Sequence, residues 1–225
     1  MNNIAIIPAR GGSKRIPRKN IKAFLGKPII AYSIEVAHHS GLFDEIMVST
    51  DDPEVADVAK QYAAHVPFFR SKKNSDDYST INDVLEEVIR KYDSLGKKFD
   101  IGCCILPTAP FITKDNLQKG YNLLIQNNFD SVRPMVRFPY PIQRAFKLDE
   151  KGHVEMLHPE FYKVRSQDLE VAYHDAGQFY WFRNPTLLKG DNRGGFEIAE
   201  TEFQDIDTLT DWKLAEFKYQ YLQQR

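Results

Sequence analysis

Short apolar runs alternate with longer amphipathic stretches over the first 136 residues. Continuous apolar runs bounded by turn-forming residues are typical of strands that are buried on both faces. This pattern predicts strands at 4–8, 45–50, 66–70, 100–106 and 131–136. Between them, apolar residues recur at helical spacing with charges on the opposite side. These stretches predict helices at 27–37, 53–63, 81–92 and 117–125.

This regular alternation of strand and helix predicts an α/β fold. A mostly parallel sheet would lie between layers of helices, and its strands would be joined by right-handed crossovers. In such sheets, ligands bind beyond the carboxyl ends of the strands. We therefore expect the functional site to include the loop that follows the first strand.

The alternation stops after Val136. Residues 137–148 and 152–157 indicate a hairpin interrupted by prolines. We expect residues 138–172 to form an inserted subdomain of a single domain spanning 1–225, with apolar side chains shared between the domain's own core and another subunit. An aromatic strand is predicted at 178–182 and a helix at 211–222, after a Thr208-x-x-Asp211 capping pattern.

Composition and charge exclude several classes of function. The 225 residues are long enough for one sizeable core, and 30 Lys and Arg residues against 31 Asp and Glu leave a net charge of −1. Nucleic acid is therefore not an expected partner. No apolar run reaches membrane-spanning length and no leader-like segment is evident, so we expect a cytoplasmic protein. The adjacent Cys103 and Cys104 are interpreted as buried thiols.

The loop after the first strand is strongly basic and contains no acid. Its Gly11-Gly12 pair would let the backbone approach a ligand closely. The five basic side chains could offset the about four negative charges of a nucleoside triphosphate; they are Arg10, Lys14, Arg15, Arg18 and Lys19. The loop matches neither the dinucleotide-binding nor the P-loop fingerprint. The alternative interpretation is a solvated basic surface.

Two acids near the C-terminus have the spacing of a metal site. In an extended segment, Asp205 and Asp207 would point to the same face. Together they could hold one hard divalent cation and leave positions for phosphate oxygens and water. The alternative is a pair of loop or cap acids.

Three stretches together resemble the acylneuraminate cytidylyltransferases, also called CMP-sialic acid synthetases. They are Ala9 to Asn20, Pro107-Thr108-Ala109-Pro110 and Asp205-Ile206-Asp207-Thr208, in the order seen in that family. The resemblance covers nearly the whole chain. It implies a Rossmann-like, three-layer nucleotidyltransferase fold with a small β-hairpin subdomain. It also implies a homodimer that activates a nine-carbon 2-keto sugar acid with CTP.

The resemblance assigns expected roles to individual residues. The triphosphate would be bound by the first motif, at Ala9, Arg10, Gly11, Ser13, Lys14, Lys19 and Asn20. Cytidine would meet Arg70, Ser79 and Thr80, and Mg²⁺ would be held by Asp205 and Asp207. Arg10, Lys19 and Asp207 are expected to be the catalytic residues. The sugar side would comprise Leu106, Thr108, Arg165, His174, Asp175 and Gln178.

The sugar side departs from the relatives that use N-acetylneuraminate. Those relatives carry a glutamine where this chain has Leu106, and an arginine-proline-asparagine run where it has His174-Asp175-Ala176. Loss of polar partners weakens recognition of a sugar that needs them. The segment Tyr173 to Trp181 resembles the pseudaminic acid branch of the family, which implies a role in glycan biosynthesis such as flagellin glycosylation. Plain packing at a strand end is the alternative for Leu106.

Several alternatives stay open at this point. The sugar could be N-acetylneuraminate, legionaminate or the eight-carbon acid of lipopolysaccharide cores. Metal coordination could acidify the attacking hydroxyl, or His174 or Asp175 could act as the base. A nucleotide-binding regulator without catalysis is the alternative from a different functional class.

Overall fold

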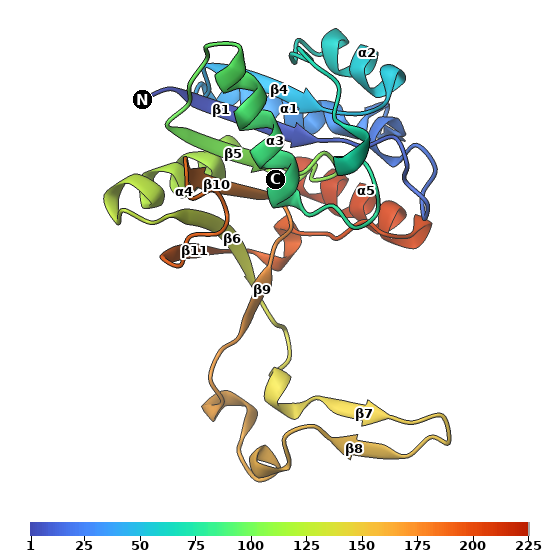
Figure 1. Ribbon diagram of the computed structural model, residues 1–225. Helices are drawn as coiled ribbons and strands as arrows, with labels where there is room; N and C mark the ends of the chain where they lie inside the picture. Colours follow the sequence, from blue (N-terminus) through green and yellow to red (C-terminus); the bar gives the residue numbers. More distant parts are fainter. Residues whose placement is uncertain (225) are drawn as a thin grey trace.

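The computed structural model describes residues 1–224, and a seven-stranded sheet forms the centre of the molecule (Figure 1). Its strand order is β11-β6-β10-β5-β1-β4, and β9 pairs with β6. The β1–β4, β1–β5 and β11–β6 pairs are parallel, while β10 runs antiparallel to β5 and β6, and β9 antiparallel to β6. The strands are β1 (Asn3–Pro8), β4 (Glu45–Ser49), β5 (Ile101–Ile105), β6 (Ser131–Arg137), β9 (Tyr173–Asp175), β10 (Phe179–Arg183) and β11 (Arg193–Ile198).

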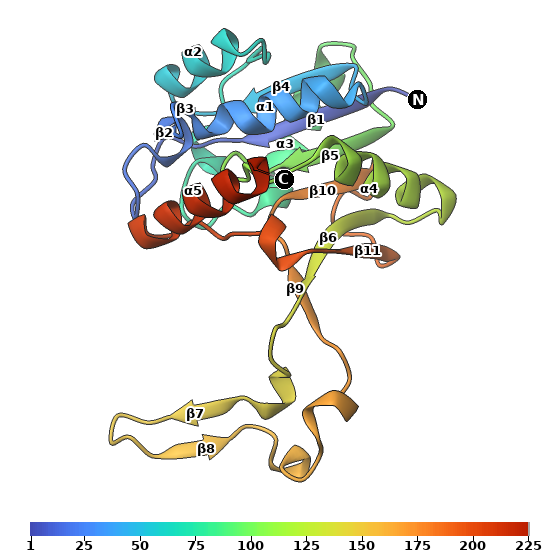
Figure 2. The same ribbon diagram turned by 180° about the vertical axis from the view of Figure 1, so that it is seen from behind.

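Helices cover both faces of the sheet, which confirms the predicted three-layer α/β architecture. One apolar layer contains side chains of α1, α2 and α4, and the other contains side chains of α3. The helix α5 packs in a third cluster with Phe24 and Tyr32 (Figure 2). The α-helices are α1 (Ile29–Ser40), α2 (Pro53–Gln61), α3 (Ile81–Ser94), α4 (Lys114–Gln126) and α5 (Leu209–Gln223). The 3-10 turns are η1 (Lys19–Ile21), η2 (Lys72–Asn74), η3 (Ile142–Arg144), η4 (Pro159–Phe161), η5 (Ser166–Asp168) and η6 (Glu200–Glu202).

The apolar strands are buried on both faces, because successive side chains point to opposite layers. In β1, Ile4 and Ile6 contact the α3 layer, whereas Ala5 and Ile7 contact the layer of α1 and α4. Gly102 of β5 leaves room for the ring of Phe182, since a Cβ there would lie 2.1 Å from that ring. This close packing fixes β10 beside β5.

The sequence pattern misjudged parts of the sheet. The strand predicted at 66–70 does not form; beside β4, His65 makes only an isolated bridge with Met47. Pro67 has no N–H to donate, so the ladder cannot continue through it. The segment makes a further contact just beyond the end of β4, where Arg70 N donates to Thr50 O at 2.8 Å. The strands β9 and β11 and the small hairpin of β2 (Ala23–Phe24) and β3 (Lys27–Pro28) were not predicted.

An arm of residues 138–172 projects from the sheet between β6 and β9, as both views show (Figures 1 and 2). It contains the antiparallel hairpin of β7 (Phe146–Leu148) and β8 (Val154–Met156). Phe146 and Leu148 are 57% and 73% exposed, whereas Leu169 is buried. Within residues 1–224, no helix is long and apolar enough to cross a membrane.

Candidate active site

The basic loop lies at the carboxyl end of β1 and is held by backbone contacts. Ala9 is buried, and its N–H donates to Ser49 O at 2.9 Å. Gly11 N donates to the Asp51 carboxylate at 3.0 Å. A Cβ at Gly11 would lie 2.4 Å from Asp52 Oδ2, so this position requires glycine for the close approach. The buried Asn20 amide donates to Arg10 O at 2.9 Å and closes the loop.

The five basic residues of this loop do not all face the cavity. Arg18 pairs with Asp52 and Glu54 at the start of α2, and its backbone adopts the left-handed region at φ 57°. Because these acids hold its guanidinium, Arg18 fixes the loop to α2. The ion pair lowers the pKa of Asp52, mainly through the hydrogen bond from Arg18. The other basic residues are left to face the space beyond β1.

A cavity of about 410 Å³ lies between the basic loop and the end of β5. It brings the predicted phosphate side and part of the predicted sugar side together, although the two stretches are about 90 residues apart in sequence. Its lining residues are Pro8, Arg10, Ser13, Lys14, Arg15, Ile16, Lys19, Asn20, Leu106, Pro107 and Thr108. The cavity therefore has the cationic groups on the side of the basic loop, and Leu106, Pro107 and Thr108 on the side of β5.

The acidic segment near the C-terminus reaches this cavity through Lys19. Lys19 Nζ donates to Ile206 O at 2.7 Å and lies 3.6 Å from Asp207 Oδ1. Arg15 Nη1 is 2.5 Å from Asp207 Oδ2. Asp207 is not the cap acid of α5, because Thr208 and Asp211 form that capping box. The alternative of a cap acid is thereby excluded for Asp207.

Asp205 lies in the same extended segment and is exposed. Its carboxylate makes no hydrogen bond or ion pair to any other residue in the range 1–224. In that range there is also no group of three or more His, Cys, Asp or Glu side chains that could hold a metal ion. A cation at Asp205 and Asp207 would thus need ligands beyond these two carboxylates.

The residues predicted for cytidine lie outside the lining of this cavity. Arg70 is 9% exposed, and its guanidinium donates to Ser49 O at 2.5 Å and to Ser49 Oγ at 3.2 Å. Burial lowers the pKa of Arg70. Ser79 Oγ donates to Lys73 O at 2.9 Å. Thr80 caps α3 in a reciprocal capping box with Asp83.

Two of the predicted sugar-side residues, His174 and Asp175, form hydrogen bonds within the chain. Asp175 accepts from Arg133 Nη1 at 3.0 Å, from Tyr180 Oη at 3.2 Å and from Gly177 N at 2.7 Å. The imidazole of its neighbour His174 donates through Nδ1 to the carbonyl of Asp175 at 2.9 Å. None of these residues lines the cavity. Arg133 and Tyr180 were not predicted, since a pairing between β6, β9 and β10 brings them to Asp175.

Two further predicted sugar-side residues lie apart from the cavity lining. Gln178 is 2% exposed and donates to Glu202 O at 2.6 Å, while its Oε1 is buried without a hydrogen-bond partner. Gln178 thereby connects β10 to η6, which precedes the acidic segment. Arg165 is on the arm, where it pairs with Asp168 at 2.7 Å.

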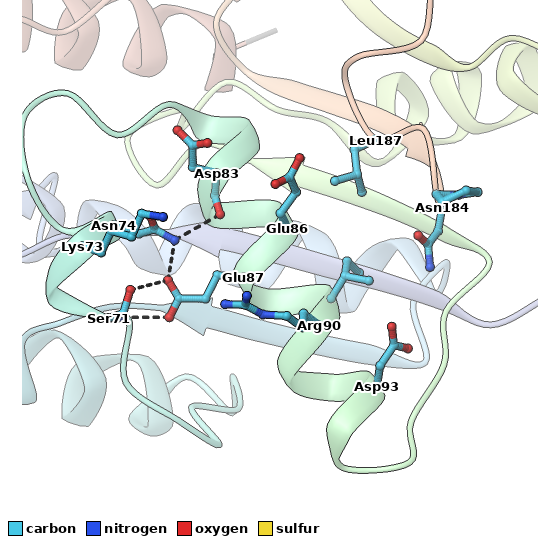
Figure 3. A pocket seen from close by; sticks show the side chains of 12 residues that line it. Ser71, Lys73, Asn74, Asp83, Glu86, Glu87, Arg90, Asp93, Asn184 and Leu187 are labelled. Atoms are coloured by element: carbon cyan, nitrogen blue, oxygen red, sulfur yellow. Dashed lines mark hydrogen bonds between the residues drawn. The ribbon is translucent and has the colours of Figure 1, made fainter.

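A second cavity, of about 460 Å³, lies between α3 and residues 184–187 (Figure 3). Glu87 of α3 is 3% exposed there and accepts from Ser71 N, Ser71 Oγ and Asn74 Nδ2 at 2.8, 2.8 and 2.6 Å. Burial opposes ionisation of Glu87, but hydrogen bonds from Lys91 and Ser71 outweigh it and lower its pKa to about 2. The lining contains none of the predicted site residues, and Glu87 there anchors the loop that carries Ser71 and Asn74.

The sequence from residue 4 to residue 221 matches the cytidylyltransferase family. The chain is 46% identical over 224 residues to the pseudaminic acid cytidylyltransferase of Campylobacter jejuni subsp. jejuni serotype O:2, a match that covers 97% of each chain. It is 31% identical over 230 residues to the CMP-N,N'-diacetyllegionaminic acid synthase of Legionella pneumophila subsp. pneumophila, covering 96% of this chain and 95% of that protein. Its fold is similar to that of a CMP:2-keto-3-deoxy-manno-octonic acid synthetase complexed with CTP, with a TM-score of 0.72, 19% identity and 100% coverage of both chains.

Proposed function

We propose that this chain, which belongs to the cytidylyltransferase family, transfers a cytidylyl group from CTP to pseudaminic acid. The sugar is supported by the 46% identity to a pseudaminic acid cytidylyltransferase over 97% of each chain. The observation that carries the chemistry is the cavity in which Arg10, Lys14 and Lys19 face the end of β5. The resulting CMP-sugar would serve as a donor in glycan biosynthesis.

In this proposal the 2-hydroxyl oxygen of the sugar attacks the α-phosphorus of CTP in line. A new oxygen–phosphorus bond forms, the bond between the α-phosphorus and the β-phosphate oxygen breaks, and pyrophosphate leaves. The hydroxyl proton is released to solvent. Little covalent chemistry falls to the protein in such transfers, so positioning and charge stabilisation account for most of the rate.

The side chains that line the cavity divide this work. Arg10, Ser13, Lys14 and Asn20 bind the triphosphate, and Lys19 with Arg10 stabilises charge that develops on the phosphates. Leu106 and Thr108 form the wall that faces the sugar. Arg70, Ser79 and Thr80 shape the adjoining region for cytidine. Their place in the cavity lining supports the roles of the first two groups, and the family resemblance alone supports those of Arg70, Ser79 and Thr80.

Mg²⁺ is the proposed cofactor, with Asp205 and Asp207 as its protein ligands. The residues fit this ion, because Asp205 is exposed without a partner in residues 1–224 and Asp207 Oδ1, at the cavity, accepts no hydrogen bond from the residues described. Mg²⁺ is commonly bound by one or two carboxylates together with substrate phosphates and waters. When bound, it would neutralise phosphate charge and act as a Lewis acid. Arg15 and Lys19 hold the Asp207 carboxylate in place.

We also propose that the protein is a homodimer in which the arm contacts the second copy. The arm exposes apolar side chains on both strands of its hairpin, including Leu148 at 73% and Val154 at 62%. Exposed apolar groups gathered on a projecting segment are typical of an interaction surface. Arg165 lies on the same arm. If Arg165 faces the sugar, the sugar would be the one bound by the second copy.

The proposed function is tested by measuring pyrophosphate release with purified protein, Mg²⁺ and CTP. Pseudaminic acid, N-acetylneuraminic acid and N,N'-diacetyllegionaminic acid are compared at equal concentration, and reactions without sugar provide the background. We expect the highest kcat/KM with pseudaminic acid, by at least about tenfold, because the apolar wall at Leu106 lacks a polar partner for the other sugars. A preference for either other sugar would refute the substrate, and no release with any of them would refute the activity.

A further inference from the structure

The loop of residues 71–80, which precedes α3, reaches the basic loop through Asp76 and Asp77. Asp77 Oδ1 lies 2.8 Å from Arg10 Nη1, and Asp77 Oδ2 pairs with Lys14 Nζ. The backbone carbonyl of Asp76 also accepts from Arg10 Nη1 at 2.8 Å. One carboxylate and one carbonyl therefore occupy hydrogen-bond donors of two side chains that line the cavity.

These donors belong to side chains that we propose bind the triphosphate. Phosphate oxygens and carboxylates compete for the same guanidinium and ammonium groups, because both are anionic acceptors. Arg10 and Lys14 cannot direct the same N–H groups to Asp77 and to a phosphate. A triphosphate that binds through Arg10 Nη1, or through the Lys14 N–H that points to Asp77, must displace the Asp77 carboxylate.

The loop is fixed at its two ends and exposed at its tip. At one end Glu87 accepts from Ser71 and Asn74 (Figure 3), and at the other Thr80 caps α3. Between them, Tyr78 is 91% exposed and the Asp77 side chain is 43% exposed. The Asp77 side chain can therefore leave its partners without loss of the buried contacts at either end.

We propose that Asp77 is an internal competitor of the triphosphate and thereby sets the affinity for CTP. This inference rests on the proposed function, since it concerns the same cavity. Asp77 pairs with Arg10 and Lys14, and both of these side chains line the cavity. Triphosphate binding would replace the ion pairs of Asp77 with Arg10 and Lys14 by ion pairs to phosphate. The free energy lost with the internal pairs then weakens the net affinity for the triphosphate.

The size of the effect follows from the exposure of these ion pairs. The side chains of Arg10, Asp77 and Lys14 are 36%, 43% and 77% exposed. Exposed pairs each alter an equilibrium constant by a factor of about 1.5 to 5. Removing both competing pairs should therefore tighten triphosphate binding by about three- to tenfold.

The test is a calorimetric titration of the wild-type protein and of Asp77→Asn with CTP, inorganic tripolyphosphate and cytidine. We expect Asp77→Asn to bind CTP and tripolyphosphate about three- to tenfold more tightly and to bind cytidine unchanged. Glu54→Gln is the matched control. It also removes an acid that pairs with a basic-loop residue, but its partner Arg18 keeps Asp52. This control should change each dissociation constant by less than about twofold.

The outcomes separate this inference from the proposed function. Unchanged or weaker binding of CTP and tripolyphosphate by Asp77→Asn would overturn the inference, because Asp77 would then be neutral or would position Arg10 and Lys14 for the phosphates. A matching gain in Glu54→Gln would also overturn it, because the effect would then come from net charge. If the wild type fails to bind CTP, the proposed function fails, and the tripolyphosphate titration still decides the role of Asp77.

Discussion

The phosphate side and the sugar side of the site are built in different ways. The phosphate side is one continuous stretch, in which Arg10, Ser13, Lys14, Lys19 and Asn20 follow β1 and line a single cavity. On the sugar side, predicted residues come from several separate segments, and many are already bound within the chain. Asp175, for example, accepts three hydrogen bonds, two of them from other strands.

This difference corresponds to what each side is proposed to recognise. A phosphate group presents the same oxygens in every nucleotide, so a single basic loop can recognise it. A sugar is recognised by shape and by a few polar contacts, which we propose are supplied here by the packing of β5, β6, β9 and β10. The phosphate side therefore depends on individual charged groups, whereas the sugar side depends on how strands are held against one another.

The largest expected effect is on the phosphate side. Asp207→Ala removes the carboxylate that lies beside Lys19 and Arg15 and that we assign to Mg²⁺. We expect kcat to fall by at least about 100-fold, as with loss of a group that stabilises transition-state charge. The measurement is pyrophosphate release over a Mg²⁺ titration, together with thermal unfolding to show that the fold is kept.

Asp191→Ala is the control for this variant, since Asp191 is exposed and lies outside the cavity lining. Its kcat should match that of the wild type. Asp207→Ala with nearly full activity in Mg²⁺ would contradict the assignment of Asp207.

An intermediate effect is expected from the arm. Changing Phe146→Asp and Leu148→Asp together places two charges on its exposed apolar hairpin. We expect the dimer to weaken by at least about tenfold, because burial of unpaired charges is costly. The KM for the sugar should rise while the dissociation constant for CTP stays the same. Light scattering over a concentration series measures the assembly.

Leu95→Asp supplies the comparison, because Leu95 is also exposed, at 62%, but lies on the body of the molecule. It should leave the assembly unchanged. A wild-type protein that is monomeric throughout the concentration series would rule out the homodimer, and a double variant that stays dimeric would exclude this surface.

The smallest effect is expected at the sugar side, where Asp175 acts through its neighbours. Asp175→Asn keeps the size of the side chain but removes the charge that faces Arg133. We expect the KM for pseudaminic acid to rise about fivefold, with the KM for CTP unchanged, since charged hydrogen bonds stabilise more than neutral ones. Asp93→Asn, an exposed acid on α3, is the control. Equal changes in both KM values would show that Asp175 supports the whole fold rather than the sugar side.

Patterns within short stretches of the sequence predicted strands and helix ends correctly. The apolar runs identified β1, β4, β5 and β6, and the Thr208-x-x-Asp211 pattern identified the capping box of α5. The basic loop is also local, because its charges and glycines follow one strand directly. In each case the residues that make up the pattern are near one another in the sequence, even where the element they form pairs with a distant one.

Contacts between distant segments could not be predicted in the same way. Arg10 meets Asp76 across 66 positions, and Arg133 meets Asp175 across 42. Such pairs follow from the strand order and from loop conformation, which periodicity does not specify. The strand predicted at 66–70 failed for a local reason, because Pro67 lacks the N–H that a strand pairing requires.

The central claim is that this site joins CMP to a nine-carbon sugar acid, and phosphorus-31 NMR tests it most directly. The spectrum would be followed in a reaction of the wild-type protein with CTP, Mg²⁺ and pseudaminic acid. We expect the three CTP signals to be replaced by one phosphodiester signal and pyrophosphate in equimolar amounts. Free CMP with pyrophosphate and no phosphodiester, or unchanged CTP, would contradict it.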